Sequence, residues 1–225
     1  MLALTDADFN RLHTYIKANY GIDLSKKKQL IVSRLSNTLA SRGYRSFSEY
    51  VDEILTGRDK EMVTSMLNKL TTNYTYFLRE EAHFQFLQNT VLPDLAKKHA
   101  RDKTLSIWSA GCSSGEEPYT ISMYLKYFVK NKDNTYTIAP VIKQNVIFQT
   151  FNLMNPIRFR RPFDLIFCRN VMIYFDQATK DALVQRFYDA TVPGGYLLIG
   201  HSEGLNKAAC PYEYLMPAIY QKTRR

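Results

Sequence analysis

The chain has 225 residues, with 30 basic and 21 acidic side chains, a formal net charge of +9 and a hydrophobic fraction of 45%. This length permits one large domain or two small ones, and the composition excludes a disordered or low-complexity chain. No apolar run is long enough to span a membrane, and the N-terminal residues lack the basic stretch of a signal peptide. The positive charge favours an acidic partner: a nucleic acid, an anionic membrane surface or an acidic protein.

The cysteines and histidines place further limits on the class of protein. The three cysteines are odd in number and far apart in sequence, so we expect no disulfide framework and a reducing, cytoplasmic location. The four histidines share no metal-ligand spacing with each other or with the cysteines, so we expect no metal. These residues are Cys112, Cys168, Cys210, His13, His83, His99 and His201.

The first 70 residues predict four short helices. Thr5 precedes an amphipathic run that ends at Gly21, and Ser25 is expected to cap a second helix over residues 26–42. Ser46 and Glu49 form a capping box for a third helix, which Gly57 ends, and a fourth covers residues 61–70. Short helices joined by brief turns are typical of a small bundle.

The remainder predicts alternating strands and helices, with a boundary between residues 70 and 95. Strands are expected over 104–111, 145–153, 163–175 and 196–202. Helices are expected over 118–129 and 176–192, and Pro193-Gly194-Gly195 is expected to form a turn. Such alternation favours a doubly wound α/β sheet.

The stretch WSAGCSSGEEPYT, residues 108–120, follows a predicted strand and precedes a predicted helix. Its Gly111-x-x-x-Gly115 spacing is neither the dinucleotide-binding pattern nor the Walker pattern. Glu116 and Glu117 would repel a phosphate but suit a cationic ligand, such as the sulfonium and ammonium groups of S-adenosylmethionine. The alternative is a helix N-terminus whose acids interact favourably with the helix dipole.

Polar residues also follow the two later strands. Arg169 and Asn170 come directly after the apolar run LIFC, where the loop should face a ligand crevice, and Tyr174 follows shortly after. The alternative is a buried strand whose next helix is capped by Asp176. In GHSEGL, residues 200–205, His201 and Glu203 are expected to serve as turn and cap residues, and a functional role is the alternative.

Residues 71–84, TTNYTYFLREEAHF, combine polar and aromatic side chains near the predicted domain boundary. We expect the rings to be buried and to fix this segment against the α/β domain, and plain interdomain packing is the alternative. The polar residues are Asn73, Thr75 and Arg79, and the rings are Tyr74, Tyr76, Phe77, Phe84 and the nearby Phe86.

In this order, NYTYFLRE, WSAGCSSGEEPYT, NLM, PFDLIFCRNVMIYFD and PGGYLLIGHSE resemble the CheR family. Its members are S-adenosylmethionine-dependent chemotaxis-receptor glutamate O-methyltransferases, and the resemblance covers nearly the whole chain. It implies a receptor-facing helical bundle over residues 1–72 and a linker contributing to the cofactor site over 73–94. A Rossmann-like α/β methyltransferase domain would then occupy residues 95–225.

The resemblance also implies a set of site residues and ligands. Arg79 and Tyr174 would lie close to the transferred methyl group. The residues around the cofactor would be Asn73, Thr75, Arg79, Ala110, Glu117, Asn152, Leu153, Arg169 and Asn170. The cofactor would be S-adenosylmethionine, with S-adenosylhomocysteine as product and no metal. The partner would be the cytoplasmic helical domain of chemotaxis receptors, with no nucleic acid and no membrane insertion.

One part of the family pattern is missing. S-adenosylmethionine-binding folds carry an acid on a second strand, where it binds the ribose, but Asp133 has no strand before it. By resemblance, roughly fifty residues are absent. We expect that the sequence omits them, and the alternative is that the protein itself lacks them. In the first case one Cα–Cα distance between Val129 and Tyr136 would far exceed the usual value of about 3.8 Å.

The predicted reaction is methyl transfer to a side-chain carboxylate, which is ionised at neutral pH and needs no general base. Two alternatives remain: a catalytically silent binding module, and a nucleic-acid methyltransferase, although the chain has no Asn/Asp-Pro-Pro-aromatic motif. A basic face for acidic receptor helices would comprise Lys26, Lys27, Lys28, Arg34, Arg42 and Arg45, unless it is simply a solvated surface.

Overall fold

The structure, a computed structural model, describes residues 2–101, 104–125, 128–130, 136–138 and 146–223. The chain folds into two compact units. The first, the helical unit, comprises Met1–Asn73 and Tyr174–Asp176, and the second, the α/β unit, comprises Tyr74–Ile173 and Gln177–Arg225. Within the described ranges, no helix is both long and apolar enough to cross a membrane.

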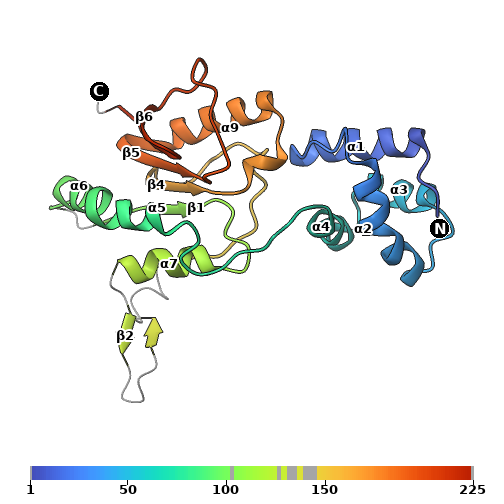
Figure 1. Ribbon diagram of the computed structural model, residues 1–225, viewed down its shortest axis with the longest axis horizontal. Helices are drawn as coiled ribbons and strands as arrows, with labels where there is room; N and C mark the ends of the chain where they lie inside the picture. The colour runs from blue at the N-terminus through green and yellow to red at the C-terminus, as the bar shows by residue number, and fades with distance from the viewer. Residues whose placement is uncertain (1, 102–103, 126–127, 131–135, 139–145, 224–225) are drawn as a thin grey trace. The chain divides into compact units, whose positions relative to one another are not determined.

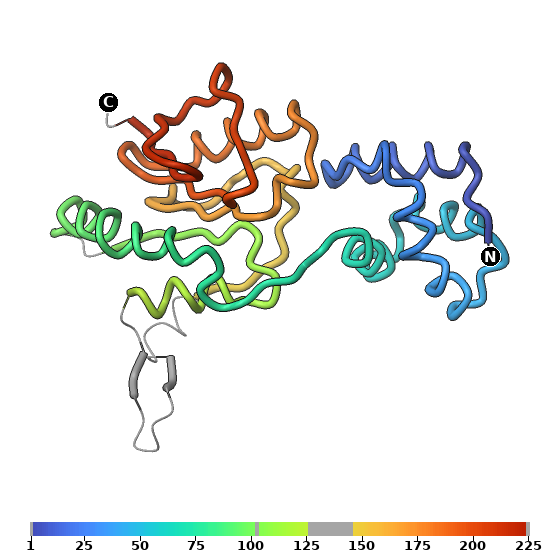
Figure 2. Tube along the Cα trace, viewed as in Figure 1, coloured from blue at the N-terminus to red at the C-terminus, as the bar shows by residue number. Residues whose placement is uncertain are grey.

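The helical unit contains four helices, which follow one another from blue to cyan in Figure 2. They are α1 (Asp6–Tyr20), α2 (Lys28–Ser41), α3 (Phe47–Thr56) and α4 (Lys60–Leu70). Each has a stripe of buried residues at helical spacing, as the sequence pattern predicts. On α2 this stripe consists of Ile31, Leu35 and Leu39.

The helix caps confirm most of the predicted boundaries. The hydroxyl of Thr5 accepts a hydrogen bond from the amide of Asp8 at 3.0 Å, and the hydroxyl of Ser46 accepts one from the amide of Glu49 at 3.2 Å. The prediction that Ser25 caps α2 is wrong, because that helix begins at Lys28 without a side-chain cap. The amide of Ser25 instead donates to the carboxylate of Asp23, which fixes a turn before the helix.

The segment Tyr174–Asp176 belongs to the helical unit although it is distant in sequence. The carbonyl of Tyr174 accepts a hydrogen bond from the amide of Asp23 at 2.8 Å, and Phe175 forms an antiparallel bridge with Ile22. Asp176 forms an ion pair with Lys17 at 2.6 Å. Backbone pairing and an ion pair therefore fix this short segment to the end of α1.

The α/β unit is built on a five-stranded sheet in the order β1-β4-β5-β7-β6 (Figure 1). The strands β1 (Ile107–Ser109), β4 (Phe163–Cys168) and β5 (Thr191–Ile199) are parallel. The last two strands, β6 (Glu213–Met216) and β7 (Ile219–Gln221), pair antiparallel. The sheet is thus mixed, and β1 is an edge strand among the described residues.

Helices cover both faces of this sheet. Figure 1 shows α9 (Gln177–Ala190) on one side and α5 (Glu81–Phe86) and α6 (Leu92–Lys98) on the other, with α7 (Glu116–Tyr124) following β1. The π-helical turn η1 (Leu87–Val91) joins α5 and α6, and the 3-10 turn η2 (Met172–Tyr174) follows β4. A core on the α5–α6 face consists of Phe84, Leu87, Val91, Leu95, Ile121, Leu165, Phe167, Tyr196, Leu198 and Ile219.

The sheet contradicts several predicted boundaries. No strand forms over the described residues 146–153, and Ile147 is 83% exposed there, because an apolar run becomes a strand only where a neighbour supplies hydrogen bonds. Pro193-Gly194-Gly195 lies inside β5 rather than in a turn. The amide of Gly194, at φ 74°, donates to the carbonyl of Lys222, so the glycine lets the strand continue.

The helix predicted over 118–129 ends at Tyr124. Residues 128 and 129 belong instead to β2 (Phe128–Lys130), which pairs antiparallel with β3 (Tyr136–Ile138). The prediction is therefore wrong for these two residues, because backbone pairing with β3 replaces the last helical turn. The predicted chain break falls between Val129 and Tyr136, where residues 131–135 lie outside the described residues.

Candidate functional site

The loop between β1 and α7 is shaped by its two glycines. A Cβ atom on Gly111 would lie 2.3 Å from a methyl carbon of Val171, so only glycine permits this approach of the loop that follows β4. Gly115 begins α7 at φ 107°, a conformation that other residues rarely adopt. The glycine spacing noted in the sequence therefore serves close backbone packing at the carboxyl ends of two neighbouring parallel strands.

The two adjacent acids of this loop have different environments. Glu116 accepts hydrogen bonds from the hydroxyl of Ser114 at the start of α7. Glu117 accepts from the hydroxyl of Ser109 at 2.7 Å and forms an ion pair with Arg169 at 3.1 Å. Burial raises the pKa of Glu117, and the charge of Arg169 only partly offsets this effect. Glu117 is thus the acid directed into the interior of the site.

Arg169 lies at the centre of the site and is only 6% exposed. Its guanidinium contacts Glu117 at 3.1 Å and Glu80 at 3.2 Å and donates to the backbone carbonyl of Arg79. The same group stacks over the ring of Phe84 at 5.2 Å. Its Nε atom is buried and has no hydrogen-bond partner among the described residues. We call Arg169, Glu80 and Glu117 the arginine cluster.

The sequence analysis did not identify Glu80, which connects three segments of the site. Its carboxylate accepts from the side chain of Asn170 and from the amide of His201, both at 3.2 Å, in addition to its ion pair with Arg169. Burial opposes ionisation, but the charge of Arg169 and these hydrogen bonds together lower the pKa of Glu80. Its position directly after Arg79 in the motif was the one signal for it.

Glu203 was expected to be a turn or cap residue, and its carboxylate does cap a loop, but it also joins two strand ends. It accepts from the backbone amides of Gly200, Asn170 and Ile173 at 2.6, 2.9 and 3.1 Å. Burial raises the pKa of Glu203, and these amides partly offset the effect. Asn170 has φ 59°, so Glu203 stabilises a backbone conformation that an asparagine tolerates better than most residues.

A pair of histidines adjoins the arginine cluster. His83 is 1% exposed, its Nδ1 lies 3.3 Å from Glu80, and its ring stacks edge-on with that of His201 at 4.2 Å. Burial, with the nearby charge of Arg169, lowers the pKa of His83 to about 4, so its ring is neutral at neutral pH. Ligand atoms of Glu80, His83 and His201 lie within 4.8 Å of one another, but a cation there would adjoin the guanidinium of Arg169.

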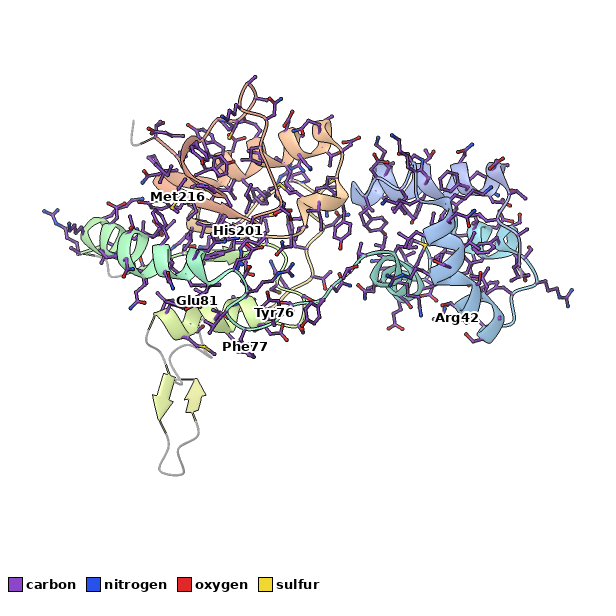
Figure 3. The ribbon with its side chains drawn as sticks, viewed as in Figure 1. Arg42, Tyr76, Phe77, Glu81, His201 and Met216 are labelled. Carbon is purple, nitrogen blue, oxygen red and sulfur yellow. The ribbon has the colours of Figure 1, made fainter. Side chains whose placement is uncertain are left out.

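The segment before α5 differs from expectation. Tyr74, Tyr76 and Phe77 are 70%, 48% and 50% exposed, so the prediction that they are buried is wrong, whereas Phe84 is buried as predicted (Figure 3 labels Tyr76 and Phe77). These rings precede α5 and extend from a segment that is neither helix nor strand. The side chain of Arg79 donates to the carbonyl of Tyr74 at 2.7 Å.

Two other predicted site residues, Ala110 and Thr75, also belong to the α/β unit. The amide of Ala110 donates to the carbonyl of Phe167 at 2.7 Å and so extends the ladder between β1 and β4 by one bond. Thr75 is half-buried between two exposed tyrosines. Both lie in the α/β unit with the arginine cluster.

The other predicted site residues have separate contacts. Asn152 caps a turn by accepting from the amide of Met154 at 3.0 Å, and the carbonyl of Leu153 accepts from Arg186 at 2.8 Å. Neither of these two hydrogen bonds involves the arginine cluster. Asn73 and Tyr174 belong to the helical unit, where the hydroxyl of Tyr174 both accepts from and donates to the backbone of residue 72.

The arginine cluster fits one end of S-adenosylmethionine. Two partly buried carboxylates can accept hydrogen bonds from an ammonium group, and the guanidinium of Arg169 can donate to a carboxylate. These are the two charged groups of the cofactor's amino-acid end. The ribose end has no such partner among the described strands. The strands β2 and β3 form a separate two-stranded sheet, and neither of them lies beside β1 with an acid at its end.

Parallel strands with polar residues at their carboxyl ends, covered by helices on both faces, define an α/β fold of the ligand-binding class. The chain matches the family described as "CheR methyltransferase, all-alpha domain" over residues 7–71. It matches the family described as "CheR methyltransferase, SAM binding domain" over residues 73–126 and 124–217. The chain belongs to the CheR methyltransferase family.

Curated relatives agree with this assignment. The "Chemotaxis protein methyltransferase" of Borreliella burgdorferi is 35% identical over 97% of this chain and 95% of its own length. The "Chemotaxis protein methyltransferase 1" of Pseudomonas aeruginosa is 30% identical, over 99% of this chain and all of the relative. The "Chemotaxis protein methyltransferase 2" of Vibrio cholerae is 30% identical over 92% of this chain and 88% of the relative.

The alignments also show an interruption. The comparison with the Borreliella burgdorferi protein extends over 270 positions, whereas this chain has 225 residues, so at least 45 positions of the alignment have no residue of this chain. The match to the SAM-binding family consists of two stretches that meet at residues 124–126. This junction lies at the end of α7, slightly before the window that the sequence pattern indicated.

Proposed function

We propose that the protein transfers the methyl group of S-adenosylmethionine to glutamate side chains of chemotaxis receptors, giving glutamate methyl esters for sensory adaptation. The observation that carries this proposal is the arginine cluster, in which two partly buried carboxylates pair with the buried guanidinium of Arg169, near the carboxyl ends of β1 and β4. Membership of a methyltransferase family supports the reaction class, and the names of the relatives support the link to chemotaxis.

The residues of the chain have distinct roles in this proposal. Glu117 holds the ammonium end of the cofactor, and Arg169 binds its carboxylate while Glu80 keeps the guanidinium in place. The cofactor, when bound, supplies an electrophilic methyl group on a sulfonium. The contribution of the protein is then alignment and exclusion of water, because the glutamate nucleophile is already ionised at neutral pH.

Arg79 is the residue that we propose to orient the substrate glutamate. Among the described residues, its guanidinium donates to a backbone carbonyl and lies 5.9 Å from the ring of Tyr76, and Arg79 is half-buried. A guanidinium in this position can form a bidentate pair with an incoming carboxylate without leaving a buried partner unsatisfied. Tyr174, in the helical unit, is proposed to lie near the sulfonium when the site is complete.

We further propose that the native sheet contains an additional strand beside β1, supplied by residues that this sequence lacks near residue 125. Support comes from the edge position of β1 and from the alignment positions without a counterpart in this chain. In the family, a strand at this position carries the acid that binds the ribose hydroxyls. The proposed domains are then the bundle over 1–72, the linker over 73–94 and the methyltransferase domain over 95–225.

The test measures binding and turnover separately. Calorimetry with S-adenosylmethionine and S-adenosylhomocysteine measures whether the α/β unit binds the cofactor. Incorporation of labelled methyl groups into membranes containing chemotaxis receptors measures the reaction, and base-labile release of the label identifies a methyl ester. Labelling of receptors supports the proposal, whereas cofactor binding without labelling refutes it.

The alternative is a catalytically silent relative that acts as a binding module. The lack of a ribose-binding acid among the described residues favours this alternative. Absence of cofactor binding together with retained receptor binding would establish it. The relatives are named as chemotaxis protein methyltransferases, so they do not support the nucleic-acid methyltransferase that the positive charge suggested.

A further inference from the structure

A second polar site lies at the other end of the sheet from the arginine cluster. It is an open pocket of about 530 Å³, lined by residues of the segment before β4, the first residue of β4 and the last turn of α9. Phe163 begins β4 and Arg169 follows its end, so the two sites are separated by roughly the 17 Å that a six-residue strand spans. Ligand pockets for small molecules have volumes of this order.

The pocket carries an excess of positive charge. Arg158, Arg161 and Arg186 line it, and Asp189 is the one acid among its lining residues, which leaves two positive charges unbalanced. Among the described contacts, neither Arg158 nor Arg161 has a hydrogen bond or ion pair, and both are exposed. The charges of these arginines therefore lack a counterpart within the described part of the protein.

Arg186 provides an independent observation. One of its terminal nitrogens donates to the carbonyl of Leu153 at 2.8 Å, but its Nε atom is buried without a hydrogen-bond partner among the described residues. Buried donors in native proteins nearly always have partners, and an unsatisfied one needs an explanation. Arg186 also lines the pocket, so this unused donor belongs to a side chain that the pocket contacts.

The charge and the lining indicate the class of ligand. A phosphate monoester carries a charge between about −1.5 and −2 at neutral pH and offers three strong acceptor oxygens, which matches two unbalanced guanidinium charges. Planar guanidinium groups bind phosphate in a bidentate manner. Phe159, Phe163 and two prolines form the apolar part of the lining, against which the carbon portion of a ligand can pack.

We propose that this pocket is a binding site for a small phosphorylated molecule, separate from the arginine cluster. The proposal does not depend on the proposed function, because it concerns different residues and a different ligand. The two exposed arginines of the pocket, Arg158 and Arg161, can be replaced without creating a buried cavity, whereas Arg186 also donates a hydrogen bond to the carbonyl of Leu153. The test therefore uses Arg158 and Arg161.

The probe is inorganic pyrophosphate, titrated into the purified protein at low ionic strength by calorimetry. The variants are the double substitution Arg158→Ala/Arg161→Ala and, as a matched control, Arg160→Ala. Arg160 is an exposed arginine of the same segment that does not line the pocket. Melting curves followed by the fluorescence of Trp108, the one tryptophan of the chain, verify that each variant is folded.

We expect binding of one pyrophosphate per chain, weakened about tenfold or more by the double substitution and less than about threefold by Arg160→Ala. Saturating S-adenosylhomocysteine should leave this affinity unchanged. Three outcomes would each overturn the proposal. The first is that Arg160→Ala weakens pyrophosphate binding as much, per charge removed, as the double substitution does. The other two are displacement of pyrophosphate by S-adenosylhomocysteine and binding of citrate as tight as that of pyrophosphate. The last outcome would indicate a general anion site without preference for phosphate.

Discussion

The side chain of Arg79 is required by the proposed function, but it is not required for the fold. Its guanidinium contacts one backbone carbonyl, while its own carbonyl, which any residue would supply, accepts from Arg169. We expect Arg79→Ala to lower methyl transfer by about a hundredfold or more with an unchanged melting temperature, because misplacing one reactant has an effect of that size. Radiolabel incorporation into receptor membranes measures this, and Arg101→Ala, at an exposed arginine outside the proposed site, is the control.

A second residue-scale prediction distinguishes the adjacent acids of the β1–α7 loop. Glu117 contacts Ser109 and Arg169, whereas Glu116 contacts Ser114. We expect Glu117→Gln to weaken binding of S-adenosylhomocysteine about tenfold, and Glu116→Gln to change it little, because only the first removes a charge beside the ammonium group. Calorimetric titration of both variants decides the matter, and equal losses would mean that the loop is not the ammonium site.

The burial of His83 should make the free energy of unfolding depend on pH. Its pKa is lowered by burial to about 4 in the folded chain, from 6.5 in the unfolded chain. Below pH 6.5 the unfolded chain therefore takes up a proton that the folded chain does not, so stability falls as the pH is lowered from 6.5 to 4. At pH 5 the loss is about 2 kcal/mol.

The variant His83→Phe retains a ring against His201. Between pH 7 and pH 5 it should lose about 2 kcal/mol less unfolding free energy than the wild type does. Urea unfolding at both pH values, followed by the fluorescence of Trp108 in the α/β unit, gives the two free energies of unfolding. The same pH dependence in the wild type and the variant would show that other groups cause it.

Among the secondary-structure elements, α2 and the residue before it carry exposed basic side chains, which we propose to attract an acidic partner. Arg34 on α2 and Lys27, the N-cap residue before this helix, are both exposed, whereas Lys28 forms an ion pair with Asp6. We expect Lys27→Glu/Arg34→Glu to raise the KM for receptor several-fold at low salt, because both changes replace attraction to an acidic partner with repulsion.

The same double variant should show a weaker salt dependence of KM and an unchanged affinity for S-adenosylhomocysteine. Charge reversal of Lys60, an exposed residue at the start of α4, provides the control. If KM at low salt is the same in the wild type and the double variant, the basic residues of α2 form an ordinary solvated surface.

The sequence predicted the elements well where the information is local. Capping residues and helical spacing located four helices, and a fully apolar run located β4, because these signals depend only on neighbouring residues. It failed where the outcome depends on a distant partner. Residues 146–153 have the composition of a strand but no strand to pair with among the described residues, and Pro193-Gly194-Gly195 continues β5 because β7 pairs beside it.

The candidate site was predicted only in part. Glu117, Arg169 and Asn170 were identified, and the structure brings them together in the α/β unit. The sequence could not identify Glu80 as the link between them, because its partners lie about 90 and 121 positions away in the chain. It also expected Arg169 to face a crevice, whereas the guanidinium is buried between two carboxylates.

For the whole molecule, we propose that the interruption near residue 125 weakens cofactor binding. We expect that insertion of the corresponding residues of the Borreliella burgdorferi relative after residue 125 tightens binding of S-adenosylhomocysteine about tenfold or more. The reason is that a strand beside β1 would supply a hydrogen-bonding acid to the ribose. Calorimetry compares the two chains, and equal affinities would show that the described residues hold the cofactor without an additional strand.

The segment Tyr174–Asp176 limits how far the protein can be divided into modules. A fragment that ends at residue 73 has all four helices of the bundle, yet it lacks the Phe175 bridge to Ile22 and the carboxylate that pairs with Lys17. It also leaves the amide of Asp23 without its acceptor. The helical unit therefore cannot be separated from the rest of the chain by a single cut without losing these contacts. A graft that keeps its full stability must carry two pieces of chain, and recombination between homologous genes at a single crossover would separate them.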